Sequence, residues 1–354
     1  MDPTTPQSFA SPVARAAHFD DRARWNGFVE HHPHASVYHR WEWGELFRDV
    51  YGTRWCPLIA MRGNRVSGVL PLVRLSSIPF GTQLVSLPYF GHGGVIADDD
   101  DTYRALFAAA RDLLPTVGAA RAELRHAHPV PADGMPTRDE KVLMQLALPD
   151  DPEILLKALG PKNRADIRRP EKEGLTAHLG GEELIPEFHA AYSSVMRDLG
   201  SPGHSARLFR EALRRMPDRC WVAVVRYQGR PIGGGFLAGM GDTLEIPCAG
   251  SLHPFTRLRG NMLLYWTILS EAIRRGYKTF SFGRSSLDSG TYMFKKNWGA
   301  VPVPLAYHYL LAEGQALPEL KPDNPKFAKV IAAWQRLPVP VATLAGPRIV
   351  RWIP

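Results

Sequence analysis

The pattern of hydrophobic and polar positions in the first 150 residues predicts a mixture of helices and strands. Two apolar runs flank the turn residues 62–65, and together they predict a strand–turn–strand hairpin. Helical spacing predicts helices at 23–30, 41–50 and 102–114, and apolar runs predict strands at 55–60, 66–75, 122–125 and 142–148. This part of the chain therefore has the pattern of an α+β domain.

The residues after 176 repeat this order of elements. The predicted helices are 182–198, 207–215 and 261–275, and the predicted strands are 220–227, 232–238, 244–249, 278–282 and 304–311. Gly276 follows the last helix at the position where glycine commonly ends helices. In both halves a hairpin is followed by a helix and then a strand. We infer a tandem α+β duplication with its joint near residues 157–176.

Length and composition agree with a folded chain of about two domains. The chain has 354 residues, 45% of them hydrophobic and 22% charged, which excludes a mostly disordered protein. The formal net charge of +8 favours anionic partners. The chain has three cysteines and no C-x-x-C pair, which argues against a disulfide scaffold or a zinc ribbon.

No stretch has the pattern of an export signal or a membrane-spanning helix. Residues 1–21 contain three prolines and no apolar core, and the long uncharged stretch 75–97 is interrupted by proline and glycine. We expect a cytoplasmic protein, and a peripheral position at the inner membrane stays open.

Candidate chemistry is densest in residues 280–299. A predicted strand leads into Gly283-Arg284-Ser285, and an aromatic and lysine-containing segment follows. Arg284 can hold a carboxylate or phosphate through two hydrogen bonds. Lys295 can stabilise an oxyanion during acyl transfer. The alternative interpretation is a solvated turn followed by a core aromatic anchor.

These residues resemble a known family. Gly-Arg-Ser at 283–285, followed by Gly-Thr-Tyr-x-Phe-Lys-x-x-Trp-Gly-Ala at 290–300, resembles the C-terminal signature of FemAB-like acyltransferases. The resemblance is nearest to the subgroup associated with exosortase (PEP-CTERM) systems, which segments 86–94, 197–205 and 260–266 also resemble. It implies an α+β fold of two tandem GNAT-like domains. We expect a flexible lead-in at 1–20, domains at 21–160 and 161–312, and a basic tail at 313–354.

The resemblance also implies an acyl-transfer site. It places Phe294 and Lys295 at that site, and Tyr292 of the same motif is assigned to substrate binding. Two features depart from classical members. The chain has no obvious helical arm for tRNA, and Pro170 should end a helix at Arg169.

Two further groups of basic residues suggest phosphate binding. Arg164 and Arg168 are four residues apart on one predicted helix face and suit a diphosphate, although a solvated helix would show the same pattern. Residues Arg257, Arg259, Gly260 and Asn261 open the strongest predicted helix, where GNAT enzymes bind the pyrophosphate of coenzyme A. Asn261 as a simple helix cap is the alternative.

Acid–base and metal chemistry have weaker candidates. His204 with Asp198 could deprotonate an attacking amine, and Arg197 beside them could bind substrate, but Arg197 and Asp198 could equally be a structural ion pair. His31, His32, His34 and His39 lie close in sequence, yet Pro33 and the lack of carboxylates argue against a metal site. We expect none.

The tail from Asn324 to Pro354 contains five cations and no acid, together with Trp334 and Trp352. This composition suits an anionic membrane surface, and packing onto the domain is the alternative.

Together these features predict an N-acyl or aminoacyl transferase that acts on a phosphate-bearing peptidoglycan or exopolysaccharide precursor. We expect no permanently bound cofactor, and acyl-CoA or aminoacyl-tRNA as the co-substrate. Two alternatives stay open. One is an acyl-CoA-dependent N-acyltransferase of an amino sugar in an exported polysaccharide. The other is a non-catalytic adaptor of a polysaccharide or exosortase system.

Overall fold

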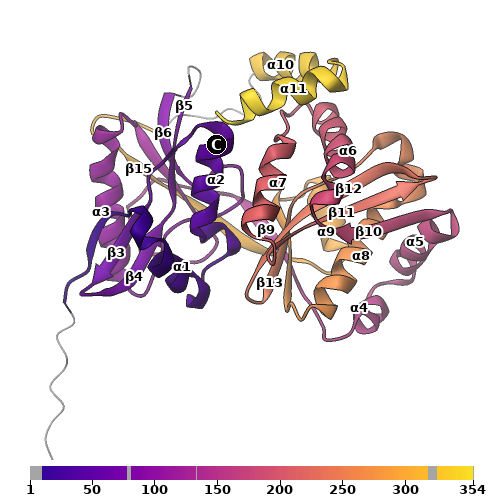
Figure 1. Cartoon of the computed structure of the whole chain (residues 1–354), viewed down its shortest axis with the longest axis horizontal. Helices are drawn as coiled ribbons and strands as arrows, with labels where there is room; N and C mark the ends of the chain where they lie inside the picture. The colour runs from indigo at the N-terminus through magenta and orange to yellow at the C-terminus, as the bar shows by residue number, and fades with distance from the viewer. Residues whose placement is uncertain (1–9, 78–80, 133, 318–324, 354) are drawn as a thin grey trace, which may run out of the picture.

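The computed structural model describes residues 10–77, 81–132, 134–317 and 325–353, and Figure 1 shows two side-by-side α+β halves joined through a central sheet. The helices are α1 Arg22–His31, α2 Trp41–Tyr51, α3 Asp100–Thr116, α4 Pro152–Ala158, α5 Pro161–Lys172, α6 Ile185–Asp198, α7 Ala206–Arg215, α8 Gly260–Arg274, α9 Gly290–Lys296, α10 Pro325–Gln335 and α11 Val339–Val350. The strands are β1 Val13–Ala16, β2 Arg54–Trp55, β3 Leu58–Arg62, β4 Arg65–Leu70, β5 Leu72–Ser77, β6 Gly81–Ser86, β7 Ile96–Ala97, β8 Arg121–His126, β9 Thr137–Ala147, β10 Leu175–Gly180, β11 Cys220–Tyr227, β12 Arg230–Met240, β13 Thr243–Ser251, β14 Thr279–Ser286 and β15 Val301–Leu311.

One long sheet runs through both halves in the order β10-β11-β12-β13-β14-β9-β15-β8-β6-β5-β2, and a smaller sheet has the order β1-β3-β4-β7. The long sheet is antiparallel except for two parallel pairs, β6 with β8 and β13 with β14. In each pair the connection between the strands contains one long helix, α3 or α8. This repeated unit confirms the tandem α+β architecture that the order of predicted elements indicated.

Two strands tie the halves together. β9 lies between β14 and β15, and β15 in turn pairs with β8 of the first half. The expected boundary at residues 160 and 161 stays a prediction.

A hydrophobic core fills the interface between the halves. Trp25, Trp43 and Phe47 from α1 and α2 pack in the same buried cluster as Phe188 and Phe209 from α6 and α7. Separate cores lie around α8 in the second half and around α3 in the first half. Because the interface is itself a core, the halves hold a fixed position relative to each other.

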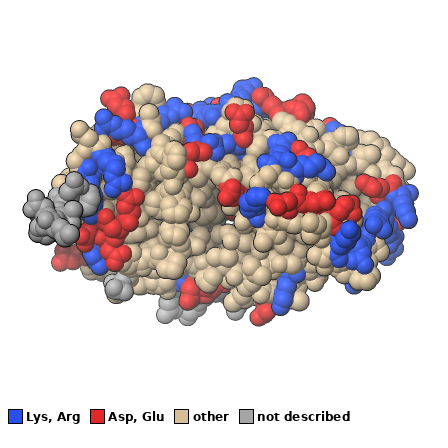
Figure 2. All heavy atoms as spheres, turned by 90° about the horizontal axis from the view of Figure 1, so that it is seen from below, with Lys and Arg blue, Asp and Glu red and all other residues tan. Residues whose placement is uncertain are grey.

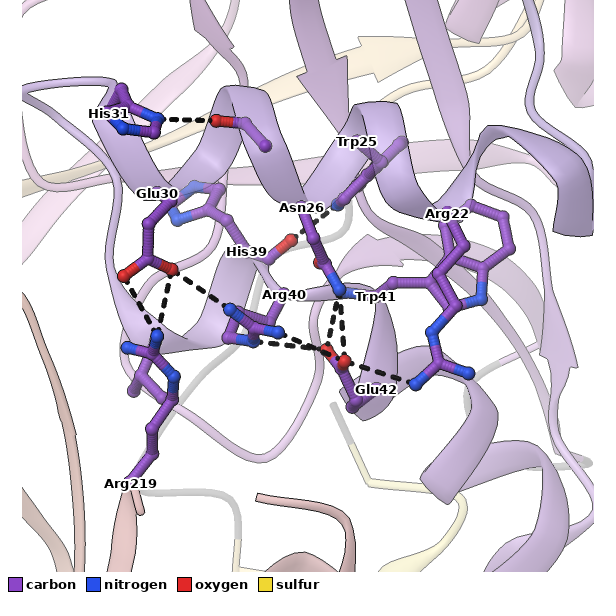
Figure 3. A network of polar contacts seen from close by, with 12 residues as sticks. Arg22, Trp25, Asn26, Glu30, His31, His39, Arg40, Trp41, Glu42 and Arg219 are labelled. Carbon is purple, nitrogen blue, oxygen red and sulfur yellow. Dashed lines mark hydrogen bonds and ion pairs between the residues drawn. The ribbon is translucent and has the colours of Figure 1, made fainter. Parts of the chain in front are cut away.

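Ion pairs reinforce one edge of this interface (Figure 3). Glu30 on α1 accepts hydrogen bonds from Arg40 of the first half and from Arg219, which directly precedes β11 in the second half. Arg40 also donates a hydrogen bond to Glu42, which accepts another from Asn26. The network therefore joins α1 and α2 to the start of β11.

Three sequence predictions need correction. The apolar run 66–75 is two strands in different sheets, because the chain turns from β4 into β5 at Pro71. The helix predicted to end at Arg169 continues to Lys172 with Pro170 inside it. Pro170 is buried and lies in the last turn, so packing offsets the lost N–H donor. Val13–Ala16 pair with β3 as an edge strand, where a flexible lead-in was expected; residues 1–9 of that lead-in lie outside the described residues.

The basic tail forms a helical hairpin on the molecule. α10 and α11 lie over α6 at the top of Figure 1. Arg197 donates to the carbonyl of Leu337 at 2.9 Å, and Gln335 donates to the carbonyl of Asp198 at 2.9 Å. A Cβ at Gly346 would lie 2.9 Å from the Gly203 carbonyl oxygen, so α11 approaches the backbone of the second half closely. The tail thus packs back on the domain.

Candidate active site

Lys295 is a buried cation at the end of α9. The helix begins where the Ser289 side chain accepts a hydrogen bond from the Tyr292 amide. The Lys295 side chain is only 8% exposed, and Nζ donates to the carbonyl oxygens of Gly283 at 3.2 Å and Arg284 at 3.0 Å. Since an ammonium group has three donors, one N–H is left to face a ligand.

The carbonyl groups that Lys295 contacts are available because two strands separate there. Thr243–Glu245 of β13 pair with Thr279–Ser281 of β14, and the two strands are not paired beyond these residues. Pro247 on β13 has no N–H to continue a ladder. Gly283 on β14 has a φ of 71°, which glycine adopts readily, at an irregularity in the pairing with β9. The gap between these parallel strands holds the site.

Two adjoining cavities meet at Lys295. The first, about 370 Å³, lies at the start of α8 and is mainly apolar; we name it the helix-start cavity. Its lining includes Ile232, Phe255, Gly260, Asn261, Leu264 and Phe294. The second, about 280 Å³, lies between the halves and is mainly polar; we name it the inter-half cavity. Its lining includes Tyr89, Phe90, Gly91, Glu245, Gly283 and Arg284. Lys295, Tyr265, Ala249 and Thr291 line both.

Burial changes the acidity of Lys295. Removal of water from around the ammonium group lowers its pKa from 10.5 to about 8, and the nearby carboxylate of Glu245 opposes this effect. At neutral pH the group is mostly protonated, but it can lose its proton within the physiological range. Such a group suits a site where charge develops during a reaction.

Glu245 is a buried carboxylate that sequence reasoning missed. It is 4% exposed and accepts hydrogen bonds from the hydroxyl groups of Tyr38 at 2.7 Å and Ser281 at 2.8 Å. Burial and Glu245 raise the pKa of Tyr38 far above its usual range, so Tyr38 keeps its proton and stays a donor. The carboxylate is therefore held in place with lone pairs still available. Glu245 lies in no sequence motif, and its hydrogen-bond partner Tyr38 belongs to the other half of the chain.

The residues predicted from the 283–300 motif lie together. Phe294 packs against Tyr265 with ring centroids 5.3 Å apart and lines the helix-start cavity. Arg284 lines the inter-half cavity and donates to the Tyr307 hydroxyl at 3.1 Å. Tyr292 is buried in the core of the second half. Its assignment to substrate binding stays a prediction.

The four residues assigned to coenzyme A lie around the start of α8, and two of them line the helix-start cavity. Gly260 and Asn261 line the helix-start cavity. Arg259 adopts a left-handed conformation with φ of 56° directly before the helix and lies 3.5 Å from Asp166 of α5. Arg257 is exposed. Since the first N–H groups of a helix have no partner within it, this end of the cavity suits a phosphate group.

The basic pair on α5 does not form a single clamp. Arg164 donates to the carbonyl oxygens of Lys157 and Leu159, so it caps the end of α4, whereas Arg168 is exposed. Lys and Arg side chains gather at the end of the molecule where α5 lies in Figure 1, with acidic side chains among them (Figure 2). Their role in substrate binding stays a prediction.

Asp198 and His204 have different partners. Asp198 is paired with Arg197 at 2.7 Å on the surface, and Arg197 also holds the tail. His204 is buried, and its Nδ1 lies 2.8 Å from the Tyr51 hydroxyl. Burial lowers the pKa of His204 to about 4. These contacts hold Arg197 and His204 in place. The roles of Asp198 and His204 in catalysis and of Arg197 in substrate binding stay predictions.

Comparison with known proteins agrees with this fold. Residues 161–296 match the family model of the acetyltransferase (GNAT) domain. The fold is that of tandem GNAT proteins. A crystal structure of FemX superposes with a TM-score of 0.64 at 15% identity, covering 84% of this chain and 97% of that chain. A tandem GNAT protein from the clavulanic acid biosynthesis pathway gives 0.51 at 14% identity, covering 86% and 99%.

A third similar structure is L-PGS from Bacillus licheniformis, with a TM-score of 0.51 at 14% identity and coverage of 90% of this chain and 98% of that chain. A search of curated protein sequences gives no significant match. Among the helices that the structure describes, none has the length and apolar character needed to cross a bilayer.

Proposed function

We propose that the protein is an N-acyl or aminoacyl transferase that acts on an amine of a cell-envelope precursor. The observation that carries the proposal is the position of Lys295, a buried cation in the wall shared by two adjoining cavities. A group-transfer enzyme needs two substrates to meet at one stabilising group. The match to an acetyltransferase domain and the FemX and L-PGS likenesses support this class.

In this mechanism the donor occupies the helix-start cavity and the acceptor occupies the inter-half cavity. The acceptor nitrogen attacks the activated carbonyl carbon, so a C–N bond forms and the bond to the donor's sulfur or oxygen breaks. The free N–H of Lys295 donates to the carbonyl oxygen as it becomes negative. Glu245 takes the proton that the nitrogen loses, since Glu245 is among the residues that line the acceptor side. The leaving sulfur or oxygen takes up a proton from solvent, and Glu245 returns its proton to solvent, so the step is balanced.

Acyl-CoA is one of the two donors proposed, and the start of α8 favours it. Gly260 and Asn261 bring unpaired helix N–H groups to the cavity, as a pyrophosphate requires. Aminoacyl-tRNA is the other donor, in keeping with the resemblance to FemAB-like enzymes. On the acceptor side, Arg284 suits a phosphate-bearing precursor, either of peptidoglycan or of an exopolysaccharide. We also propose that the chain belongs to the PEP-CTERM-associated subgroup and works in the cytoplasm.

The experiment supplies each donor separately to the purified chain. Isotope-labelled acetyl-CoA or a labelled aminoacyl-tRNA pool is incubated with an extract of nucleotide- and lipid-linked precursors, and mass spectrometry follows label on an amine. We expect label from one donor, and transfer on the order of 100-fold slower with the Lys295→Ala variant. If neither donor labels any amine, and the Lys295→Ala variant restores a deletion strain fully, the chain is an adaptor and the transferase proposal is wrong.

A further inference from the structure

The α10–α11 hairpin exposes many apolar side chains, and we name its exposed surface the hairpin face. Twelve large hydrophobic side chains are exposed in the described residues, and five of them belong to this hairpin. They are Val330, Ile331, Val341, Leu344 and Ile349, of which Val330 and Leu344 are 65% and 66% exposed. Exposed apolar side chains that gather on one face mark a contact surface.

The same hairpin is strongly basic. Residues 324–354 contain five Lys and Arg residues and no Asp or Glu, and Lys329, Arg336 and Arg348 are exposed. A second copy of the chain would bring the same positive charge against this face. Cations beside exposed aliphatic side chains instead complement an anionic lipid surface, where head groups pair with the cations and the aliphatic groups enter the interface.

An apolar groove borders this face. It lies between α6 and α11, has a volume of about 770 Å³, and is lined on the α11 side by Val339, Pro340, Thr343 and Leu344. Ala190 and Pro231 are on its opposite wall. Because the exposed Leu344 belongs to both features, the groove extends the apolar surface into the molecule.

The hairpin is attached to the site as well as to α6. Tyr89 donates from its hydroxyl to the Arg351 carbonyl at 3.0 Å, and its side chain also lines the inter-half cavity. A surface bound to the hairpin is thus linked to the wall of this cavity through one side chain.

We propose that the α10–α11 hairpin is a docking surface for an anionic lipid bilayer. The helices, of 11 and 12 residues, are too short to cross a bilayer and lie in its interface. Lys329, Arg336 and Arg348 bind anionic head groups, and Val341, Leu344 and Ile349 insert beside them. Docking needs neither donor nor acceptor, so a binding experiment tests this proposal independently of the transferase activity.

The test is sedimentation of the full chain with vesicles of phosphatidylcholine alone or mixed with phosphatidylglycerol. We expect binding to the anionic vesicles that weakens as salt rises, and little binding to the neutral ones. Replacing Lys329, Arg336 and Arg348 together with Gln should weaken binding on the order of 100-fold. Leu344→Glu should also abolish binding.

The matched control is Ile154→Glu, also an exposed apolar position, on α4 at 55% exposure, which should bind like the parent. Because all these side chains are exposed, the variants should keep the parent's melting temperature. The proposal is overturned if the parent ignores anionic vesicles or if Leu344→Glu binds as well as Ile154→Glu. The proposal is also overturned if Leu344→Glu alters only a concentration-dependent dimerisation of the chain, since the hairpin face would then bind a second copy.

Discussion

The low pKa of Lys295 predicts a measurable dependence of stability on pH. In the folded chain burial lowers this pKa from 10.5 to about 8, whereas in the unfolded chain the side chain is solvated and keeps its ordinary value. Between these two values the unfolded state binds more protons, so the free energy of unfolding rises with pH. Below pH 8 both states are protonated, and the full cost of the buried charge is present.

The magnitude follows from the difference between the two pKa values. At 1.36 kcal/mol per pH unit, the change from 10.5 to about 8 corresponds to about 3 kcal/mol, without a large correction for solvent because the side chain is 8% exposed. The Lys295→Met variant has no group to titrate there. Relative to this variant, the parent should therefore gain about 3 kcal/mol as the pH rises from below 8 to above 10.5.

Urea unfolding followed by tryptophan fluorescence at several pH values between about 7 and 11 measures this difference. The neighbouring Lys296→Met variant is the control, since Lys296 is exposed and its removal should leave the pH dependence of the parent unchanged. Parallel stability curves for the parent and the Lys295→Met variant would refute the reasoning, because the ammonium group would then carry no burial cost.

Two further predictions concern packing and the thiol groups. In urea unfolding, Gly44→Ala should lower the free energy of unfolding by about 1–3 kcal/mol, because the added Cβ would overlap the Trp55 ring. Gly27→Ala should raise the free energy of unfolding by about 0.5–1 kcal/mol, because Gly27 lies in α1 with open space around it. Equal effects of the two substitutions would contradict the packing described. A thiol reagent at pH 8 should react slowly with the native chain, whereas after denaturation it should modify three thiol groups. The reason is that burial raises the pKa of all three cysteine thiols, that of Cys248 to about 12. Fast labelling of the native chain would contradict the burial of these thiols.

Local patterns predicted most of the secondary structure. The turn between the predicted strands 220–227 and 232–238 and the end of α8 were predictable because Gly229 and Gly276 readily adopt positive φ values, here 75° and 84°. Such turns depend on neighbouring residues only. The repeated order of elements then indicated the duplication, and the structure confirmed it.

Positions that depend on distant contacts were not predictable. The continuous apolar run 66–75 gave no sign that its two parts belong to different sheets. Pro170 was expected to stop a helix, but its burial in the last turn of α5 could not be known from neighbouring residues. The exchange of β9 and β15 between the halves likewise depends on long-range pairing.

The candidate site shows the same division. Lys295, Phe294 and Arg284 lie within one short motif and were found together. Glu245 required the fold, because its hydrogen bond to Tyr38 joins positions 207 residues apart. The predicted association of Asp198 with His204 relied on closeness in sequence, whereas α6 and the following loop direct their side chains to different partners.

The rate of transfer at Lys295 tests the central claim most directly. Once a donor and an acceptor are known, single-turnover rates are compared for the parent, Lys295→Ala and Lys296→Ala under identical conditions. Lys295→Ala should lower the rate on the order of 100-fold because one oxyanion donor is lost. Lys296→Ala, at the exposed neighbouring position, should stay within about twofold of the parent. Equal, small effects at both positions would contradict the assignment of the two cavities to donor and acceptor on either side of Lys295.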